Sequence, residues 1–198
     1  MKMAKKFLAV ALAGVLALSV LTGCGNSVKS KDIAEALTKM GVKTEQSKDM
    51  DKTAENTLKA IEAIVNAPDN AAKADDDTSK ITLDNAVKMS DGKIIEMNNI
   101  INDPNNAVKK ALGMMATGTP AETANATKKV QVALVNIENA KKDASLQAAL
   151  VKDGLIATHV IIFSIDKEIA ETGKLGSAKT SDGKYILVVI VTDIVDAA

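Results

Sequence analysis

The sequence predicts an α+β fold, in which several helices in the N-terminal two-thirds pack on a small sheet whose main strands lie near the C-terminus. Up to about residue 152, apolar residues recur mostly at the spacing of one helix face. After Leu155 the pattern changes. Residues 156–165 and 185–195 are rich in β-branched side chains and apolar at odd and even positions, which is typical of strands covered on both faces. Two strands alone are marginal, so we expect a third, and residues 80–83 are the candidate.

Several helices follow from the positions of apolar and capping residues. Asp103-Pro104 and Thr119-Pro120-Ala121-Glu122 each place a cap before a first-position proline, and each predicts a helix start. Residues 144–151 continue the second of these helices or begin another. The apolar faces are Ile33, Leu37 and Met40; Ala54, Leu58, Ile61 and Val65; Ile94, Met97 and Ile101; Val108 and Leu112; and Val130, Ala133, Leu134 and Ile137.

Two long polar stretches are expected to be loops. Residues 67–80 contain few bulky apolar groups and predict an exposed loop. Residues 166–183 connect the two predicted strands, and a connection of this length holds a short helix in residues 166–172 or carries function. The motif KxSDGKxI occurs at residues 88–95 and again at residues 179–186. Asp-Gly is a common turn pair, so we interpret the copies as two independent turns, the second of which directs the chain into the last strand.

The first 24 residues have the layout of a secretory signal peptide. Lys2, Lys5 and Lys6 form a cationic start, and residues 7–21 are apolar except for Gly14 and Ser19. The apolar run is shorter than the about 20 residues that a membrane-spanning helix needs. Small residues then lead to Cys24, which is the single cysteine of the chain.

The stretch Leu21-Thr22-Gly23-Cys24 resembles the lipobox of bacterial lipoproteins, and the resemblance covers residues 1–24. It implies that residues 1–23 are removed and that Cys24 becomes the lipid-modified first residue of the mature chain. Two or more acyl chains make a stable membrane attachment. We therefore expect a signal peptide at residues 1–23, a lipidated tether at residues 24–31 and a single α+β ectodomain at residues 32–198. The other interpretation of Cys24 is an incidental or buried cysteine behind an ordinary signal peptide.

Charge and composition exclude some partners. Residues 1–23 contain three lysines and no acidic residue, so their removal takes the formal net charge from 0 to −3. A mildly acidic ectodomain has no electrostatic reason to bind nucleic acid, and all its basic residues are lysines, which lack the bidentate grip of arginine. Phe163 and Tyr185 are the only aromatic residues after residue 23, which disfavours binding of sugars or single-stranded nucleic acid by stacking. With Cys24 acylated, no disulfide can form.

His159 is the only histidine, so histidine chemistry would have to use it, together with Ser164, Asp166 or Glu168 nearby in the sequence. On a strand, however, His159 shares its face with Ile161, Phe163 and Ile165, whereas Ser164 points the other way. A hydrogen-bonded histidine of the core or of a sheet edge is the favoured interpretation.

Residues 113–119 have the glycine spacing of a phosphate-binding loop, but Pro120 and Thr119 replace its required residues, so we interpret them as a turn between helices. Met114 and Met115 in this turn are candidates for an adaptable contact patch.

Metal and cofactor sites are not predicted. The stretch Asp75-Asp76-Asp77 begins like a calcium loop, but Lys80 stands at the expected glycine and Ala86 at the expected glutamate. A solvated acidic loop fits this stretch better, and no His/Cys cluster suggests zinc.

The sequence predicts a membrane-anchored, extracytoplasmic lipoprotein whose non-enzymatic domain binds an envelope protein or ligand or has a structural role. The alternative is an envelope hydrolase or accessory enzyme that uses His159 and nearby acids. A solute-capturing transporter component is a third candidate, but 175 residues after the signal peptide are few for the usual two lobes.

Overall fold

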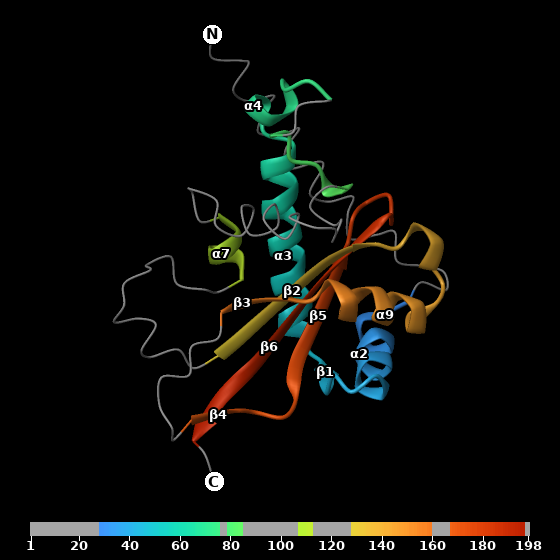
Figure 1. The fold of residues 1–198 in the computed structure, drawn as a ribbon, viewed down its shortest axis with the longest axis vertical. Helices are drawn as coiled ribbons and strands as arrows, with labels where there is room; N and C mark the ends of the chain where they lie inside the picture. The colour runs from blue at the N-terminus through green and yellow to red at the C-terminus, as the bar shows by residue number, and fades with distance from the viewer. Residues whose placement is uncertain (1–27, 76–78, 85–106, 113–127, 160–166, 197–198) are drawn as a thin grey trace.

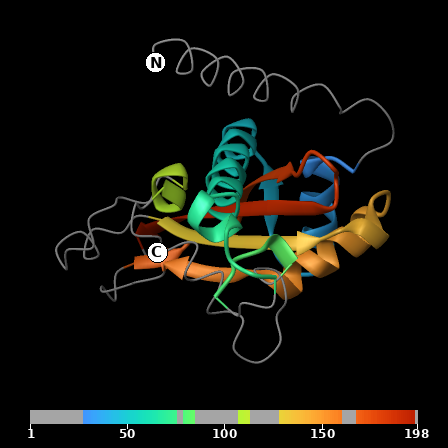
Figure 2. The ribbon, with the colours of Figure 1, turned by 90° about the horizontal axis from the view of Figure 1, so that it is seen from above.

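The computed structural model describes residues 28–75, 79–84, 107–112, 128–159 and 167–196. In these ranges the chain has an α+β fold of three layers, because a mixed sheet lies between helices on both faces (Figures 1 and 2). This confirms the predicted fold class. The elements in chain order are α2 (Ser30–Lys39), β1 (Thr44–Gln46), α3 (Lys48–Val65), α4 (Pro68–Ala71), α7 (Ala107–Ala111), β2 (Lys128–Asn136), η1 (Glu138–Ala140), α9 (Ala144–Gly154), β3 (Ile156–His159), β4 (Lys167–Ile169), β5 (Gly173–Lys179) and β6 (Tyr185–Asp196).

The sheet is built around β6, its longest strand. The strand order is β1-β5-β6-β2-β3, and β4 also pairs with β6. Among the described strands only β1 and β5 run parallel, whereas the other pairs are antiparallel. Residues 170–172 alone separate β4 from β5, and the Ala170 N–H donates to the Asp193 carbonyl of β6 at 2.9 Å. The strand β4 therefore continues the line of β5 along the same side of β6.

Alternate residues of β6 point into two different cores. Tyr185, Leu187 and Val189 pack with apolar residues of α3 and α7 on one face. The residues between them, Ile186, Val188 and Ile190, pack with α2 and α9 on the other face. The sequence predicted a strand covered on both sides at residues 185–195, and the structure confirms it. The strand β3 confirms the first part of the strand predicted at residues 156–165, and residues 160–165 lie outside the described ranges.

The two predicted N-terminal helices are present. Ile33 and Leu37 of α2 are fully buried, as are Ala54 and Ile61 of α3. The helix α9 begins at a cap, where the Asp143 carboxylate accepts a hydrogen bond from the Leu146 N–H at 2.9 Å. The helix α7 has Val108 on its buried face, as predicted. The expected helix starts at residues 103–104 and 119–122, and the apolar face at residues 94–101, lie outside the described residues.

One predicted helix is a strand. The stripe of Val130, Ala133, Leu134 and Ile137 fits helical spacing, but residues 128–136 form β2, next to β6. In this strand Val130, Val132 and Leu134 pack toward α3, whereas Ala133 and Val135 pack toward α2 and α9. A strand buried on both faces has apolar residues at nearly every position, so it also satisfies a helical pattern.

Both predicted loops contain regular structure. The helix α4 lies within residues 67–80. Residues 166–183 include β4 and β5, and residues 167–169 form a strand where a short helix was one alternative. The third strand predicted at residues 80–83 is wrong. There the Asn70 amide donates to the carbonyls of Val65 and Ile81, both at 2.7 Å, and its oxygen accepts from the Ile81 N–H at 2.8 Å. These bonds hold the segment against the end of α3.

The folded part of the chain begins before the predicted boundary at residue 32. Val28 is only 8% exposed and belongs to the core between α2, α9 and the sheet. The helix α2 then starts at Ser30. Residues 28–31 are thus part of the domain. The Val28 side chain is stabilised by burial in the core, and Ser30 and Lys31 belong to the first turn of α2.

Candidate functional site

The predicted site residues fall largely outside the described part of the chain. Cys24, Met114 and Met115 belong to segments that are not described. His159 is the last residue of β3, and its backbone lies opposite Val130 of β2. Of the acids that would assist it, Asp166 also lies outside the described ranges, and Glu168 is an exposed residue of β4.

The strand order keeps His159 and Glu168 apart. β2 and β6 lie between β3 and β4, and neighbouring strands are about 4.8 Å apart, so the two backbones are separated by about 14 Å across the sheet. They also differ along the strands, since Val130 lies opposite Val191 whereas Glu168 lies opposite Val195. The structure therefore does not bring this predicted acid to the histidine.

The acidic loop forms an ion pair. Asp75 accepts a hydrogen bond from Lys80 Nζ at 2.6 Å, and this bond holds the pKa of the exposed carboxyl below its ordinary value. Lys80 stands at the position where a calcium loop needs glycine. Among the described residues, no cluster of three or more His, Cys, Asp or Glu residues is placed to hold a metal ion.

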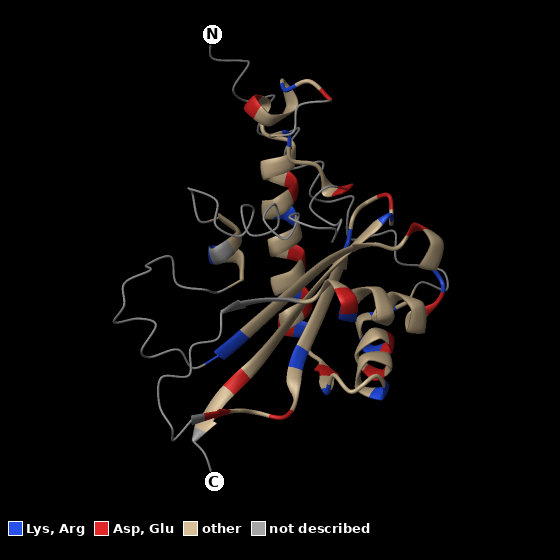
Figure 3. Cartoon of the chain, viewed as in Figure 1, with Lys and Arg blue, Asp and Glu red and all other residues tan. Residues whose placement is uncertain are grey.

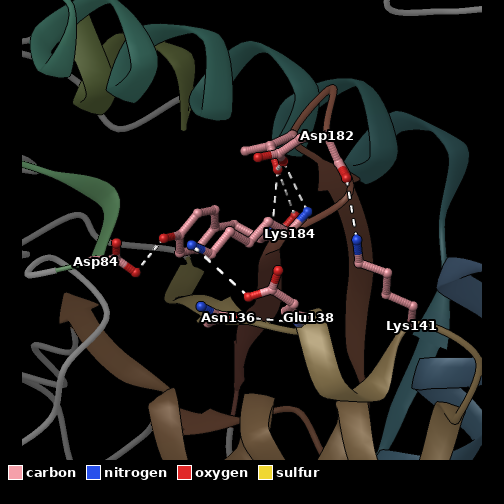
Figure 4. Close-up of polar contacts among 8 residues, drawn as sticks. Asp84, Asn136, Glu138, Lys141, Asp182 and Lys184 are labelled. Atoms are coloured by element: carbon pink, nitrogen blue, oxygen red, sulfur yellow. Dashed lines mark hydrogen bonds and ion pairs between the residues drawn. The ribbon is translucent and has the colours of Figure 1, made fainter.

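A set of polar side chains gathers where the β5–β6 hairpin turns, next to η1 (Figure 4), and Glu62 of α3 joins it through its charge interaction with Asp182. We call this set the hairpin cluster: Glu62, Asp84, Glu138, Lys141, Thr180, Asp182, Lys184 and Tyr185. Its turn is the second KxSDGKxI copy, and it leads the chain into β6 as predicted. Gly183 has a φ of +65°, a conformation that favours glycine.

Asp182 organises the turn. Its Oδ1 accepts hydrogen bonds from Thr180 Oγ1 at 2.6 Å and from the Lys184 N–H at 2.9 Å. These bonds, together with the charge of Lys141, lower the pKa of Asp182 although partial burial opposes them. Lys141 Nζ also donates to the Asp182 carbonyl at 3.4 Å, which connects the turn to the residue after η1.

Tyr185 closes the inner side of the hairpin cluster. Its ring is buried in the core beneath α3, and its hydroxyl donates to the Asp84 carboxylate. Burial, followed by this hydrogen bond and the charge of Asp84, raises the pKa of Tyr185 above its ordinary value of 10.0. The phenol is therefore a hydrogen-bond donor at neutral pH. Lys184 Nζ lies 5.5 Å from the centre of the ring, within cation–π range.

Glu62 brings a second carboxyl from α3 to the turn. Burial raises its pKa, the charge of Asp182 raises it further, and the charge of Lys59 opposes both effects. In the hairpin cluster, the Glu62 carboxyl thus keeps its proton to a higher pH than usual, whereas the Asp182 carboxyl stays ionised to a lower pH than usual. Because Thr180 and Tyr185 are already engaged in hydrogen bonds within the cluster, the arrangement primarily fixes the turn.

A second polar cluster holds the first described residues of the chain. We call it the attachment cluster: Val28, Ser30, Asp51, Ser177 and Lys179. Ser30 Oγ donates to Asp51 Oδ1 at 2.6 Å and lies 2.7 Å from Ser177 Oγ. Lys179 Nζ donates to the Val28 carbonyl at 2.8 Å, and burial lowers the pKa of this lysine although Asp32 opposes the shift. The cluster could not be predicted from the sequence, because its members lie far apart in the chain.

The comparisons with known proteins give no relative. No protein-family model, no curated protein and no solved structure matches the chain. In the described ranges, no helix combines the length and the apolar character needed to cross a membrane.

Proposed function

We propose that the protein is a lipoprotein of the bacterial cell envelope, held on the extracytoplasmic face of the cell membrane by a lipid on Cys24. Its domain would act without catalysis, either by binding an envelope protein or ligand or by structural support. One observation carries the proposal: the cationic start, the apolar run, the small residues and the sole cysteine occur in this order in residues 1–24.

The position of the domain relative to Cys24 supports the same function. Val28, the first buried residue in the described part of the chain, follows Cys24 by four positions, so the linker spans at most about 14 Å. A domain on so short a linker would remain next to the membrane and would meet its partners there. Multiple acyl chains on the cysteine make such an attachment stable.

The hydrolase alternative receives less support. It requires an acid near His159, and the strand order separates this residue from Glu168. Of the described acids with shifted pKa values, Glu62 and Asp182 belong to the hairpin cluster, and Asp75 pairs with Lys80.

Expression of the Cys24→Ser variant in a bacterial host tests the anchor. The original protein should incorporate a labelled fatty acid, partition into detergent and have the mass of a chain that begins at a lipidated Cys24. The variant should retain its signal peptide and incorporate no label. Ser27→Ala is the matched control, because it changes a neighbouring small residue and should leave processing unchanged. A variant that is still labelled, or still cut before residue 24, would contradict the proposal.

Crosslinking of the lipidated protein in intact cells tests the binding role. We expect a discrete crosslinked partner or ligand that is lost or reduced with Cys24→Ser. Turnover of an envelope ester, peptide or glycan by the purified protein, abolished by His159→Ala, would favour the hydrolase instead.

A further inference from the structure

The attachment cluster joins the start of the described chain to the middle of the domain. Val28 is buried, and its carbonyl accepts from Lys179 of β5. Two residues later, Ser30 contacts both Ser177 of β5 and Asp51 of α3. Asp51 Oδ1 also accepts from the Ser177 N–H at 3.1 Å, so the three elements are connected at one point.

The domain extends far from this point in two opposite directions along its long axis (Figure 1). In one direction, Ser177 lies opposite Val188 and Glu168 lies opposite Val195, so the β4 end is about 23 Å away along β6. In the other direction, α3 runs from Asp51 to Val65, which is about 21 Å at 1.5 Å per residue, and α4 lies beyond it. The attachment point is therefore close to the midpoint of the long axis.

The linker is shorter than either of the two distances by which the domain extends from the attachment point, along β6 and along α3. Four residues from Cys24 to Val28 span at most about 14 Å. If the domain stood upright, one of its ends would have to fit between Val28 and the membrane surface, and both distances are too long for this. We propose that the lipidated domain lies on its side, with its long axis parallel to the membrane and the neighbourhood of Val28 against the lipid headgroups. This inference rests on the proposed lipid at Cys24.

The strand order defines which side faces the lipid. The attachment cluster lies on β5, next to the edge strand β1, and β3 forms the opposite edge, three strands and about 14 Å from β5. In the proposed orientation, the β1–β5 edge and the start of α2 face the headgroups, and the β3 edge faces away from them. Acidic and basic residues are interspersed over the described elements (Figure 3), and exposed Lys31 pairs with Glu35 at 3.8 Å. The orientation is thus set by the covalent link rather than by attraction of charges.

Energy transfer from single labelled positions to acceptor-labelled headgroups tests the orientation. Because Cys24 is the only cysteine and carries the lipid, an introduced cysteine is the only free thiol. We choose three exposed positions: Lys31→Cys near the attachment, Asp69→Cys in α4 and Glu168→Cys in β4. Each lipidated mature protein is purified from membranes and reconstituted into vesicles whose headgroups carry the acceptor dye.

We expect equal transfer efficiencies from positions 69 and 168, and an efficiency from position 31 at least as high as from both. An efficiency at one end that exceeds the other by about twofold or more would show an upright domain and overturn the inference, since the two ends extend about 21 Å along α3 and about 23 Å along β6 from the attachment point. A change in the relative transfer efficiencies of the three positions in high salt would also overturn the inference, because charge would then set the orientation.

A lengthened linker provides the second variant. An insertion of about twelve Gly and Ser residues between Ser27 and Val28 should lower the transfer from position 31, because the longer coil lets the domain leave the surface. Unchanged transfer would contradict the inference. Intact mass measured on each sample separates the two proposals: an unmodified Cys24 refutes the anchor itself, whereas unequal ends on an acylated protein refute only the side-on orientation.

Discussion

Replacing Gly176 by alanine is expected to push α3 away from β5. Gly176 is a buried residue of β5, and a Cβ atom there would lie 1.9 Å from the carbonyl carbon of Met50 and 2.2 Å from the Asp51 nitrogen. Both atoms belong to the backbone of α3, so no side-chain rotation can relieve the overlap. Ordinary contact distances are 3.4–4 Å, so the helix would have to move by about 1.5–2 Å.

The expected cost combines overpacking with two hydrogen bonds. Overpacking of a core costs about 1–3 kcal/mol. The shift also strains the bond from the Ser177 N–H to Asp51 Oδ1 at 3.1 Å and the bond from the Ser47 N–H to the Leu175 carbonyl at 2.8 Å. At about 1 kcal/mol for each bond, the free energy of unfolding should fall by roughly 3–5 kcal/mol. This is a large part of the about 5–15 kcal/mol that stabilises a typical domain.

Urea denaturation followed by circular dichroism measures this loss. Gly41→Ala is the matched control, because Gly41 has a φ of +88° but a Cβ atom there would meet no neighbouring group within 4 Å. It should lose only the about 1–2 kcal/mol that a left-handed conformation costs an L-residue. If Gly176→Ala destabilises the protein no more than Gly41→Ala does, the close approach of α3 to β5 is not as described.

Two further substitutions test other contacts. Asn70→Ala removes three hydrogen bonds that hold residue 81 to the end of α3, and should lower the free energy of unfolding by about 2–3 kcal/mol, whereas exposed Asn66→Ala should change it little. For Glu62, burial and Asp182 raise the pKa in the folded state, so the folded protein binds this proton more tightly than the unfolded chain does. The resulting stabilisation is complete below the ordinary pKa of 4.5 and is lost as the pH rises through the raised pKa. Glu62→Gln should flatten this part of the stability profile measured by thermal melts from pH 4 to 8, exposed Glu45→Gln should not, and a steeper profile would contradict the assignment.

The elements with one unambiguous pattern were predictable from the sequence. Ile33 and Leu37 in α2, and Ala54 and Ile61 in α3, recur at helical spacing and are all buried. The strand β6 is apolar at successive positions, and its residues pack against helices on both faces. In these elements the periodicity directly reflects which side chains face the core.

Other elements depend on contacts that the local sequence does not reveal. The strand β5 contains two glycines and no β-branched residue, and its place in the sheet rests on pairing with β6 and on the close approach of α3 at Gly176. The strand β1 is three residues long and carries no apolar pattern. For β2 the pattern was visible but ambiguous, because burial on both faces also produces helical spacing.

The candidate sites also contain a part that the local sequence predicts and a part that depends on distant contacts. The turn of the hairpin cluster was predictable, because Asp182-Gly183 specifies it locally. The partners that surround this turn come from other segments, such as Glu62 of α3 and Glu138 of η1. The attachment cluster joins residues up to 151 positions apart, so only the folded chain reveals it.

The residues that cover the outer side of β5 have a consequence for the proposed attachment of many copies to one membrane. A bare strand edge offers N–H and carbonyl groups that can pair with a neighbouring molecule. Here β1 covers residues 173–175, the Ser47 N–H occupies the Leu175 carbonyl, and the Asp51 carboxylate occupies the Ser177 N–H. Confinement to a surface would bring bare strand edges of neighbouring molecules together repeatedly. The Asp51 carboxylate beside β5 would also repel the carbonyl groups of an approaching strand. Under the proposed anchoring, the same few contacts that pack α3 on β5 would thus limit pairing of β5 between neighbouring molecules.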